Sequence, residues 1–194
     1  MEENILHRKE RIIITTIDII DEIGILSLST REIARRQGVS EATLFRHFKS
    51  KNDILIAVLD YFSQFDTDIY QSTILKKLKP IDAVTYYVTA NTEYYENYPA
   101  ITSIMQIFDV LKGEQGLTDK INEIKNRSTH YLKLLIEEAL LVGDLRVEID
   151  SEILALMISG LCREICLTWR LSGKNFSLKE KTLIALKLLL EKSR

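Results

Sequence analysis

Basic and small polar side chains gather in one short part of the chain, from Leu28 to Lys51. This part contains six basic residues against two acidic ones, Glu32 and Glu41. The basic residues are Arg31, Arg35, Arg36, Arg46, Lys49 and Lys51. Guanidinium and ammonium groups bind phosphate oxygens, and arginine can also read guanine through two hydrogen bonds. The first 51 residues hold nine basic and eight acidic residues, so the placement of the charges, more than their sum, indicates a nucleic-acid surface.

Local signals predict that two short helices position these side chains. A capping box over residues 29–32 starts a helix at Thr30. Gly38 ends this helix, and Ser40 can cap a further helix over 41–48. Two short helices that meet at a glycine turn form a helix-turn-helix, in which the second helix enters the major groove and the first crosses the DNA backbone.

The second helix of the pair is expected to turn one face to the core and another to the groove. Leu44 and Phe48 lie four residues apart and can face the core together. The residues left nearer to the groove are Glu41, Ala42, Thr43, Arg46 and His47. Thr43 is small enough to touch a base edge or a thymine methyl, whereas Arg46 can either bind guanine or clamp a phosphate.

Three further basic residues are expected to bind the DNA backbone. Arg31 lies in the first turn of the first helix, where the helix N-terminal amides also favour phosphate. Lys49 and Lys51 flank the start of the next helix and can bind phosphates in the same way. Phosphate contacts of this kind position a protein on the duplex and do not specify the sequence.

The motif made by residues 30–34 (TREIA) and 38–51 (GVSEATLFRHFKSK) closely resembles the DNA-binding domain of the TetR family of transcriptional regulators. The resemblance covers the N-terminal part of the chain. It implies base or backbone contacts from Thr30, Arg31, Thr43, His47 and Lys51, and it places the ring of Phe45 next to the phosphates.

Two residues of the motif stand out. Many members of this family have tyrosine where this chain has Phe45, which offers no hydroxyl to a phosphate, so that contact is lost or taken by Arg46. Glu41 lies where DNA would bring negative charge, and it can accept from cytosine or simply favour the helix N-terminus. A solvated charged face is the alternative reading, but the caps, the turn glycine and the buried positions agree better with DNA binding.

The rest of the chain indicates an all-α protein, because only two prolines and seven glycines interrupt 194 residues. Helical spacing and caps predict about nine helices. Their expected ranges are 5–24, 30–37, 41–48, 51–70, 80–97, a segment that starts at Pro99, 117–142, 150–171 and 177–192. We expect a DNA-binding domain over 1–50 and a larger ligand-sensing and dimerisation domain over 51–194, joined rigidly by the fourth helix.

Aromatic and small polar residues are dense between Pro80 and Leu111, as in a ligand pocket between helices. Tyr87, Asn91, Tyr94 and Phe108 are the predicted ligand contacts. The alternative is ordinary core packing, which is the commoner use of tyrosine at helical spacing.

The last two expected helices carry broad apolar faces that could form a four-helix interface in a homodimer. The residues on these faces are Leu154, Met157, Ile158, Leu161, Cys162, Ile165, Trp169, Leu183, Leu186, Leu189 and Leu190. The family resemblance implies the same arrangement, although some of these side chains must pack within one protomer. A dimer would read a palindromic operator in double-stranded DNA.

Several other kinds of site are not expected. The longest apolar run is too short to span a bilayer, and an acidic N-terminus with core-like cysteines indicates a cytoplasmic protein. The histidines and cysteines lack zinc-site spacing, no cofactor motif occurs, and no catalytic motif indicates an enzyme. Cys162 and Cys166 share a helix face, but buried packing explains them better than redox sensing.

These patterns together predict a transcriptional regulator, most simply a repressor that a small-molecule effector releases from its operator. The change would reach the DNA through a movement of the fourth helix. The alternative is a helical DNA-binding factor that acts architecturally or through protein contacts and has no ligand response.

Overall fold

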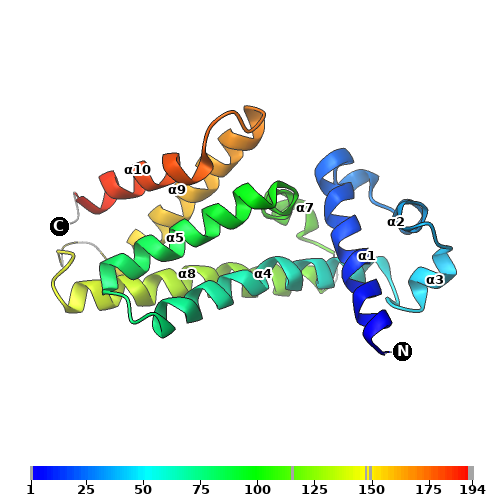
Figure 1. The fold of residues 1–194 in the computed structure, drawn as a ribbon, viewed down its shortest axis with the longest axis horizontal. Coiled ribbons are helices and arrows are strands. Elements are labelled where there is room, and N and C mark those ends of the chain that lie inside the picture. Colours follow the sequence, from blue (N-terminus) through cyan, green and yellow to red (C-terminus); the bar gives the residue numbers. More distant parts are fainter. Residues whose placement is uncertain (1, 115, 147, 149, 192–194) are drawn as a thin grey trace. The chain divides into compact units, whose positions relative to one another are not determined.

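The structure is a computed structural model that describes residues 2–114, 116–146, 148 and 150–191, with side chains from residue 8 onward. In these ranges it contains ten α-helices and no strand, which confirms the expected all-α fold (Figure 1). The helices are α1 Glu2–Ile23, α2 Thr30–Gln37, α3 Glu41–Phe45, α4 Lys51–Leu75, α5 Pro80–Asn97, α6 Thr102–Gln106, α7 Phe108–Leu111, α8 Leu117–Leu141, α9 Ser151–Leu171 and α10 Leu178–Glu191. None of the described helices combines the length and apolar character needed to cross a membrane.

The chain divides into two compact units. The first unit contains the chain up to Gln64 together with Pro99–Glu123, and the second contains Phe65–Tyr98 and the chain from Ile124 onward. Helices α4 and α8 therefore each contribute one part to the first unit and the other part to the second.

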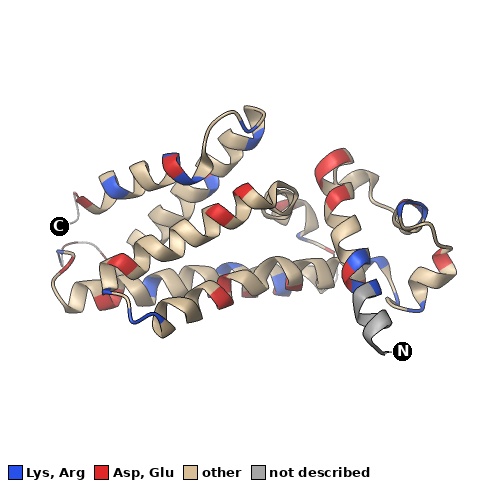
Figure 2. Ribbon diagram, viewed as in Figure 1, with Lys and Arg blue, Asp and Glu red and all other residues tan. Residues whose placement is uncertain are grey.

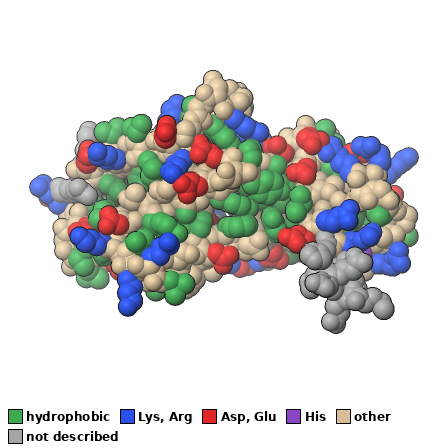
Figure 3. All heavy atoms as spheres, in the orientation of Figure 1, with side chains coloured by type: hydrophobic (Ala, Val, Ile, Leu, Met, Phe, Trp, Pro, Cys, Tyr) green, Lys and Arg blue, Asp and Glu red, His purple; other side chains and the backbone are tan. Residues whose placement is uncertain are grey.

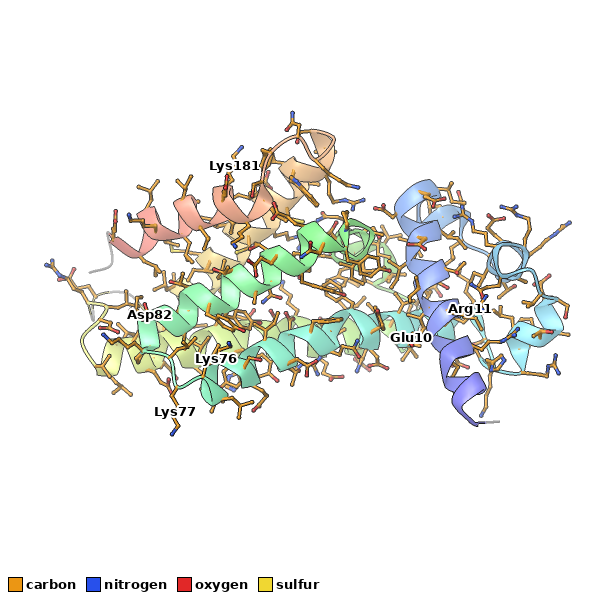
Figure 4. All side chains as sticks on the ribbon, in the orientation of Figure 1. Glu10, Arg11, Lys76, Lys77, Asp82 and Lys181 are labelled. Atoms are coloured by element: carbon orange, nitrogen blue, oxygen red, sulfur yellow. The ribbon has the colours of Figure 1, made fainter. Side chains whose placement is uncertain are left out.

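The core of the first unit forms around α1, which packs on α2 and on α6. The isoleucines at positions 12, 17, 19 and 20 of α1 are buried, as the helical spacing of apolar residues predicts. Hydrogen bonds add to this packing. The Gln37 side chain at the end of α2 donates to the Arg11 carbonyl at 3.2 Å and to the Thr15 hydroxyl, both on α1. Figure 4 marks Arg11 on α1.

The core of the second unit is formed by α5, α8, α9 and α10, and α10 packs on both α5 and α9. Val84, Ile136, Ala155 and Ile158 in this core are completely inaccessible to solvent. Side chains from neighbouring helices also satisfy the helix ends. Glu96 of α5 accepts from the Lys179 backbone amide at 3.3 Å, near the start of α10.

Three of the helical segments differ from the sequence expectations. Helix α3 ends at Phe45, because the amides of His47 and Phe48 both turn back to the Leu44 carbonyl at 2.9 and 3.1 Å. Helix α4 continues to Leu75, since no glycine or proline occurs before Pro80 and its last turns pack on the second core.

The third difference lies after Pro99. The segment that starts at Pro99 is broken into a 3-10 turn, α6 and α7, and the last two meet at Ile107. The expected end of the last helix at Lys192 lies outside the described residues.

One carboxyl group is buried in the second unit. The Asp66 side chain on α4 accepts hydrogen bonds from Ser128 of α8 and Tyr87 of α5, whose hydroxyl oxygens lie 3.4 Å apart. Burial raises the pKa of Asp66 to about 6, although these hydrogen bonds and the nearby Arg127 charge oppose the rise. The folded protein therefore favours the protonated form of Asp66 more than the unfolded chain does, although the carboxylate still predominates at pH 7.

This burial predicts that the second unit becomes more stable as the pH falls from 7 to 5. The folded state holds the Asp66 proton with a pKa of about 6, against 3.8 for the ordinary carboxyl, so it binds more protons than the unfolded state in this range. The expected gain in the free energy of unfolding is about 1 to 1.5 kcal/mol. Urea unfolding at both pH values should show this gain in the wild type and lose it in Asp66→Asn.

Asp68→Asn is the matched control, because Asp68 lies on the same helix with an exposed side chain. It should keep the wild-type difference between the two pH values. An Asp66→Asn protein with the full wild-type gain would show that another group carries the pH dependence.

Candidate nucleic-acid interface

Helices α2 and α3 form the predicted helix-turn-helix, and local capping explains both starts. The Ser29 hydroxyl accepts from the Glu32 amide at 3.1 Å, and the Ser40 hydroxyl accepts from the Thr43 amide at 3.2 Å. Between the helices, Gly38 adopts the left-handed conformation with φ 64°, which glycine reaches without steric cost. The turn thereby places α3 directly after α2.

The inner face of this pair is apolar. Ile33, Ala34, Leu44 and Phe48 are buried, so the two core positions inferred from their spacing of four are confirmed. The predicted DNA contacts lie on the outer side. Arg31, Glu41, Ala42, Phe45, Arg46, Lys49 and Lys51 are exposed, and Thr30, Thr43 and His47 are half-buried.

Two of the six basic residues counted in the sequence form ion pairs within the protein. Arg35 binds Glu32 at 2.7 Å, and Arg36 binds both Glu32 at 2.9 Å and Glu22 at 2.6 Å. The hydrogen bonds from the two arginines lower the pKa of Glu32 to about 2. The i,i+3 and i,i+4 spacings from Glu32 already allowed these pairs.

Four basic residues of the motif form no ion pair within the described part of the chain, and they stay available for phosphates. They are Arg31, Arg46, Lys49 and Lys51. Figure 2 marks lysine and arginine positions in blue along the α2 and α3 part of the first unit, and Figure 3 shows such side chains on the surface there.

Sequence reasoning missed two cations of α1. Burial lowers the pKa of His47, and the positive charges of Arg8, Lys9 and Arg46 lower it further. The Lys9 ammonium also lies 5.9 Å from the ring centre of Phe48. Arg8 and Lys9 therefore belong to the same basic surface as the motif, and their clustering near the start of α1 was the available signal.

The candidate reading side chains already contact one another in the protein alone. Arg46 donates to the Thr43 hydroxyl oxygen at 3.0 Å, and Thr43 lies 3.0 Å from the Ser40 hydroxyl. Thr30 of α2 donates to the Glu41 carboxylate of α3 at 2.6 Å. These contacts hold Thr43 and Glu41 in defined positions on the exposed surface.

The predicted ligand contacts are divided between the two units. Tyr87, Asn91 and Tyr94 lie on α5 in the second unit, where Tyr94 stacks on Phe65 with ring centres 4.0 Å apart. Phe108 lies in α7 of the first unit and packs edge-on against Phe62 at 5.8 Å.

The α5 residues have polar neighbours as well as aromatic ones. Tyr87 belongs to the buried group around Asp66, and Asn91 donates to the Tyr87 carbonyl at 3.0 Å. In the α4 part of the same unit, Tyr70 stacks on Tyr131 with ring centres 4.2 Å apart. Apolar surface with a few placed polar groups is the composition of a ligand-binding region.

The structure also divides the apolar residues of the last two helices between the inside and the surface. Leu154, Ile158, Trp169, Leu186 and Leu190 are buried within the second unit. A separate set remains 46–64% exposed in the single chain, namely Ile153, Leu156 and Met157 on α9 and Ile184 and Leu188 on α10. Figure 3 shows hydrophobic side chains on the surface along α10.

The two cysteines lie four residues apart on α9. Burial, with a smaller contribution from Cys166, raises the pKa of the Cys162 thiol to about 12. A thiol in this state is a poor nucleophile, as expected for a packed residue. Within the described residues, no group of acidic, histidine and cysteine side chains could hold a metal ion.

Two family models match separate parts of the chain. The model of bacterial regulatory proteins of the tetR family matches residues 12–58. The model described as YsiA-like protein, C-terminal region, matches residues 61–192.

Comparisons with whole proteins agree with these matches. The fatty acid metabolism regulator protein of Bacillus subtilis (strain 168) is 24% identical over 174 residues, which cover 87% of this chain and 86% of that protein. The nucleoid occlusion factor SlmA of Vibrio atlanticus (strain LGP32) is 22% identical over 155 residues, 79% of each chain. The crystal structure of Bacillus subtilis FadR in complex with stearoyl-CoA has the same fold, with a TM-score of 0.81, 23% identity and coverage of 93% of this chain and 97% of that one.

Arg35 is ion-paired with Glu32, whereas Arg31 forms no ion pair within the described residues. We therefore expect the two arginines of α2 to contribute differently to DNA binding. Binding of a scrambled duplex should weaken with salt, and Arg31→Ala should reduce the slope of log affinity against log salt by about 0.9 for each protomer, since one phosphate contact is lost. Arg35→Ala should leave the slope nearly unchanged, because Arg35 is paired with Glu32. Fluorescence anisotropy over a salt series measures both slopes.

Equal slope changes in the two variants would contradict the assignment of Arg31 to a phosphate and Arg35 to an internal ion pair. Thermal unfolding of both variants provides the control for folding.

Proposed function

Because this chain belongs to the TetR family of bacterial transcriptional regulators and carries its helix-turn-helix, we propose that it is a repressor released from operator DNA by a long-chain acyl-CoA. The similarity to the fatty acid metabolism regulator protein of Bacillus subtilis, which covers 87% of this chain, carries this proposal. The fold shared with a FadR that binds stearoyl-CoA supports the ligand class.

In this function, residues 1–50 bind DNA, and residues 51–194 sense the ligand and form the dimer. In the first part, Arg31, Lys49 and Lys51 bind phosphates, and the exposed residues of α3 face the major groove. A dimer presents two such helices, so the operator is palindromic. A repressor that occupies chromosomal DNA acts in the cytoplasm.

Ligand contacts are proposed for Tyr87, Asn91 and Tyr94 of α5 in the second unit. Phe108 of α7 is proposed separately, as a contact within the first unit. The aromatic rings suit an acyl chain, and the hydroxyl and amide groups suit the polar thioester end. The buried Asp66 carboxyl argues for a thioester over a free fatty acid, because a second carboxylate beside it would face like-charge repulsion in a buried setting.

Helix α4 supplies the physical link between ligand and operator. Its first residue is Lys51 of the DNA motif, and the same continuous helix carries Phe65 and Asp66, which contact Tyr94 and Tyr87 of α5. A ligand that replaces these contacts favours a different position of α4 and so changes the population that fits the operator.

We expect stearoyl-CoA to lower the affinity for operator at least about tenfold, the ordinary size of an allosteric coupling. The operator is first selected from a random duplex library with the wild-type protein. Anisotropy titrations of that duplex then compare stearoyl-CoA with CoA alone and with stearate. Neither control should act, because one lacks the chain and the other carries a carboxylate.

The controls separate the parts of the proposal. Release by CoA alone would contradict recognition of the chain, and release by stearate would contradict the role given to Asp66. Selective DNA binding that no acyl-CoA of any chain length alters would favour the ligand-independent alternative, which the similarity to a nucleoid occlusion factor keeps as the second candidate.

Homodimerisation through α9 and α10 is the further part of the proposal. The exposed apolar residues of both helices would be covered by the partner, which removes apolar area from water. Gly160 lies among them on the exposed side of α9, and an added Cβ there would meet nothing within 4 Å. Glycine weakens a helix, so its use at this position fits close approach of a partner helix.

Met157→Asp should therefore convert the dimer to a monomer and weaken operator binding, because a charge would be buried in the interface. Sedimentation velocity measures the first effect and anisotropy the second. Leu141→Asp is the matched control, since Leu141 is 86% exposed but lies at the end of α8. A Met157→Asp protein that stays dimeric would place the interface elsewhere.

A further inference from the structure

Glu41 is an acidic side chain on the surface that faces DNA. It is the first residue of α3, it is exposed, and its carboxylate accepts from the Thr30 hydroxyl at 2.6 Å. The exposed cations Arg31 and Arg46 belong to the same motif. A negative charge at this position opposes the electrostatic attraction on which non-specific DNA binding depends.

The other acidic residue of the motif shows why Glu41 is different. Glu32 is neutralised by Arg35 and Arg36, so its charge scarcely reaches the DNA surface. Glu41 forms no ion pair within the described part of the chain, and a neutral hydroxyl is its hydrogen-bond partner. Its full negative charge therefore remains where phosphates approach.

The hydrogen bond to Glu41 also changes what Thr30 can offer. A hydroxyl has one proton to donate, and the Thr30 proton is directed to the carboxylate. While this bond holds, Thr30 presents only lone pairs to a phosphate, which cannot donate to them. The Thr30–Glu41 hydrogen bond thus removes a possible contact with the DNA backbone, and the Glu41 charge repels the phosphates.

A carboxylate has only acceptor sites. Only a base edge that carries a hydrogen-bond donor can therefore compensate for the loss of water around it. In the major groove, the amino groups of cytosine and adenine are the donors, whereas guanine and thymine present acceptors at the matching positions. Burial of an unmatched carboxylate against an acceptor leaves it without its hydrogen bonds.

We propose that Glu41 is a specificity-determining residue, which weakens binding to DNA in general and is compensated only where the operator presents a base amino group, foremost that of cytosine. This inference rests on DNA binding by the helix-turn-helix and does not depend on the ligand. The protein discriminates because the Glu41 carboxylate weakens binding to every sequence, and only a sequence with a base amino group at the right position compensates for this loss.

The test compares wild type, Glu41→Gln and Asp68→Asn on two duplexes, the selected operator and a scrambled version of it, by anisotropy over a salt series. Glu41→Gln keeps the size and an acceptor oxygen but removes the charge. We expect it to bind the scrambled duplex more tightly and the operator no more tightly, so the affinity ratio falls about tenfold, the effect of one base pair read.

Asp68→Asn removes the same charge outside the motif and should leave the ratio unchanged. A second selection with Glu41→Gln should lose the preference for cytosine or adenine at one symmetric pair of operator positions. Equal tightening on both duplexes, or an unchanged base preference, would overturn the inference. A wild-type protein that distinguishes neither duplex would instead overturn the proposed operator binding itself.

Discussion

The continuous helix α4 is the constraint on which the rest of this structure depends. No glycine or proline interrupts it between Lys51 and Leu75, so its backbone is continuously helical. Its first half supplies buried side chains to the first unit, and its second half supplies Phe65 and Asp66 to the second. Each core therefore depends on a different part of the same helix.

The helix-turn-helix is organised by internal charge pairing before any DNA is present. Glu32 draws Arg35 and Arg36 toward the protein, while Arg31 and the motif lysines remain outward. A protein with every arginine outward would gain affinity for all duplexes alike, because phosphate contacts carry no sequence information. The pairing therefore leaves fewer cations of α2 for general phosphate contacts.

The local signals in the sequence predicted the starts of α2 and α3 more closely than the extent of the longer helices around them. The caps at Ser29 and Ser40 and the turn at Gly38 fixed α2 to within the residue, since they depend only on near neighbours. The length of α4 and the division of the α9 and α10 faces depend on packing partners far along the chain, which periodicity cannot identify. Phe108 shows the same limit, because its neighbour Phe62 lies on another helix.

The buried Asp66 connects the proposed ligand contacts of α5 with helix α4. Its carboxyl belongs to α4, yet its hydrogen-bond partners belong to α5 and α8. A polar ligand atom that competes for Ser128 or Tyr87 would leave the carboxyl with fewer donors, and a buried carboxyl without donors is costly. The carboxyl can respond by taking up a proton, since its pKa is already about 6, or by movement of the helix that carries it. In the proposed mechanism, recognition of the polar ligand end is coupled to the position of α4, and by thermodynamic reciprocity bound operator would weaken ligand binding by the same factor.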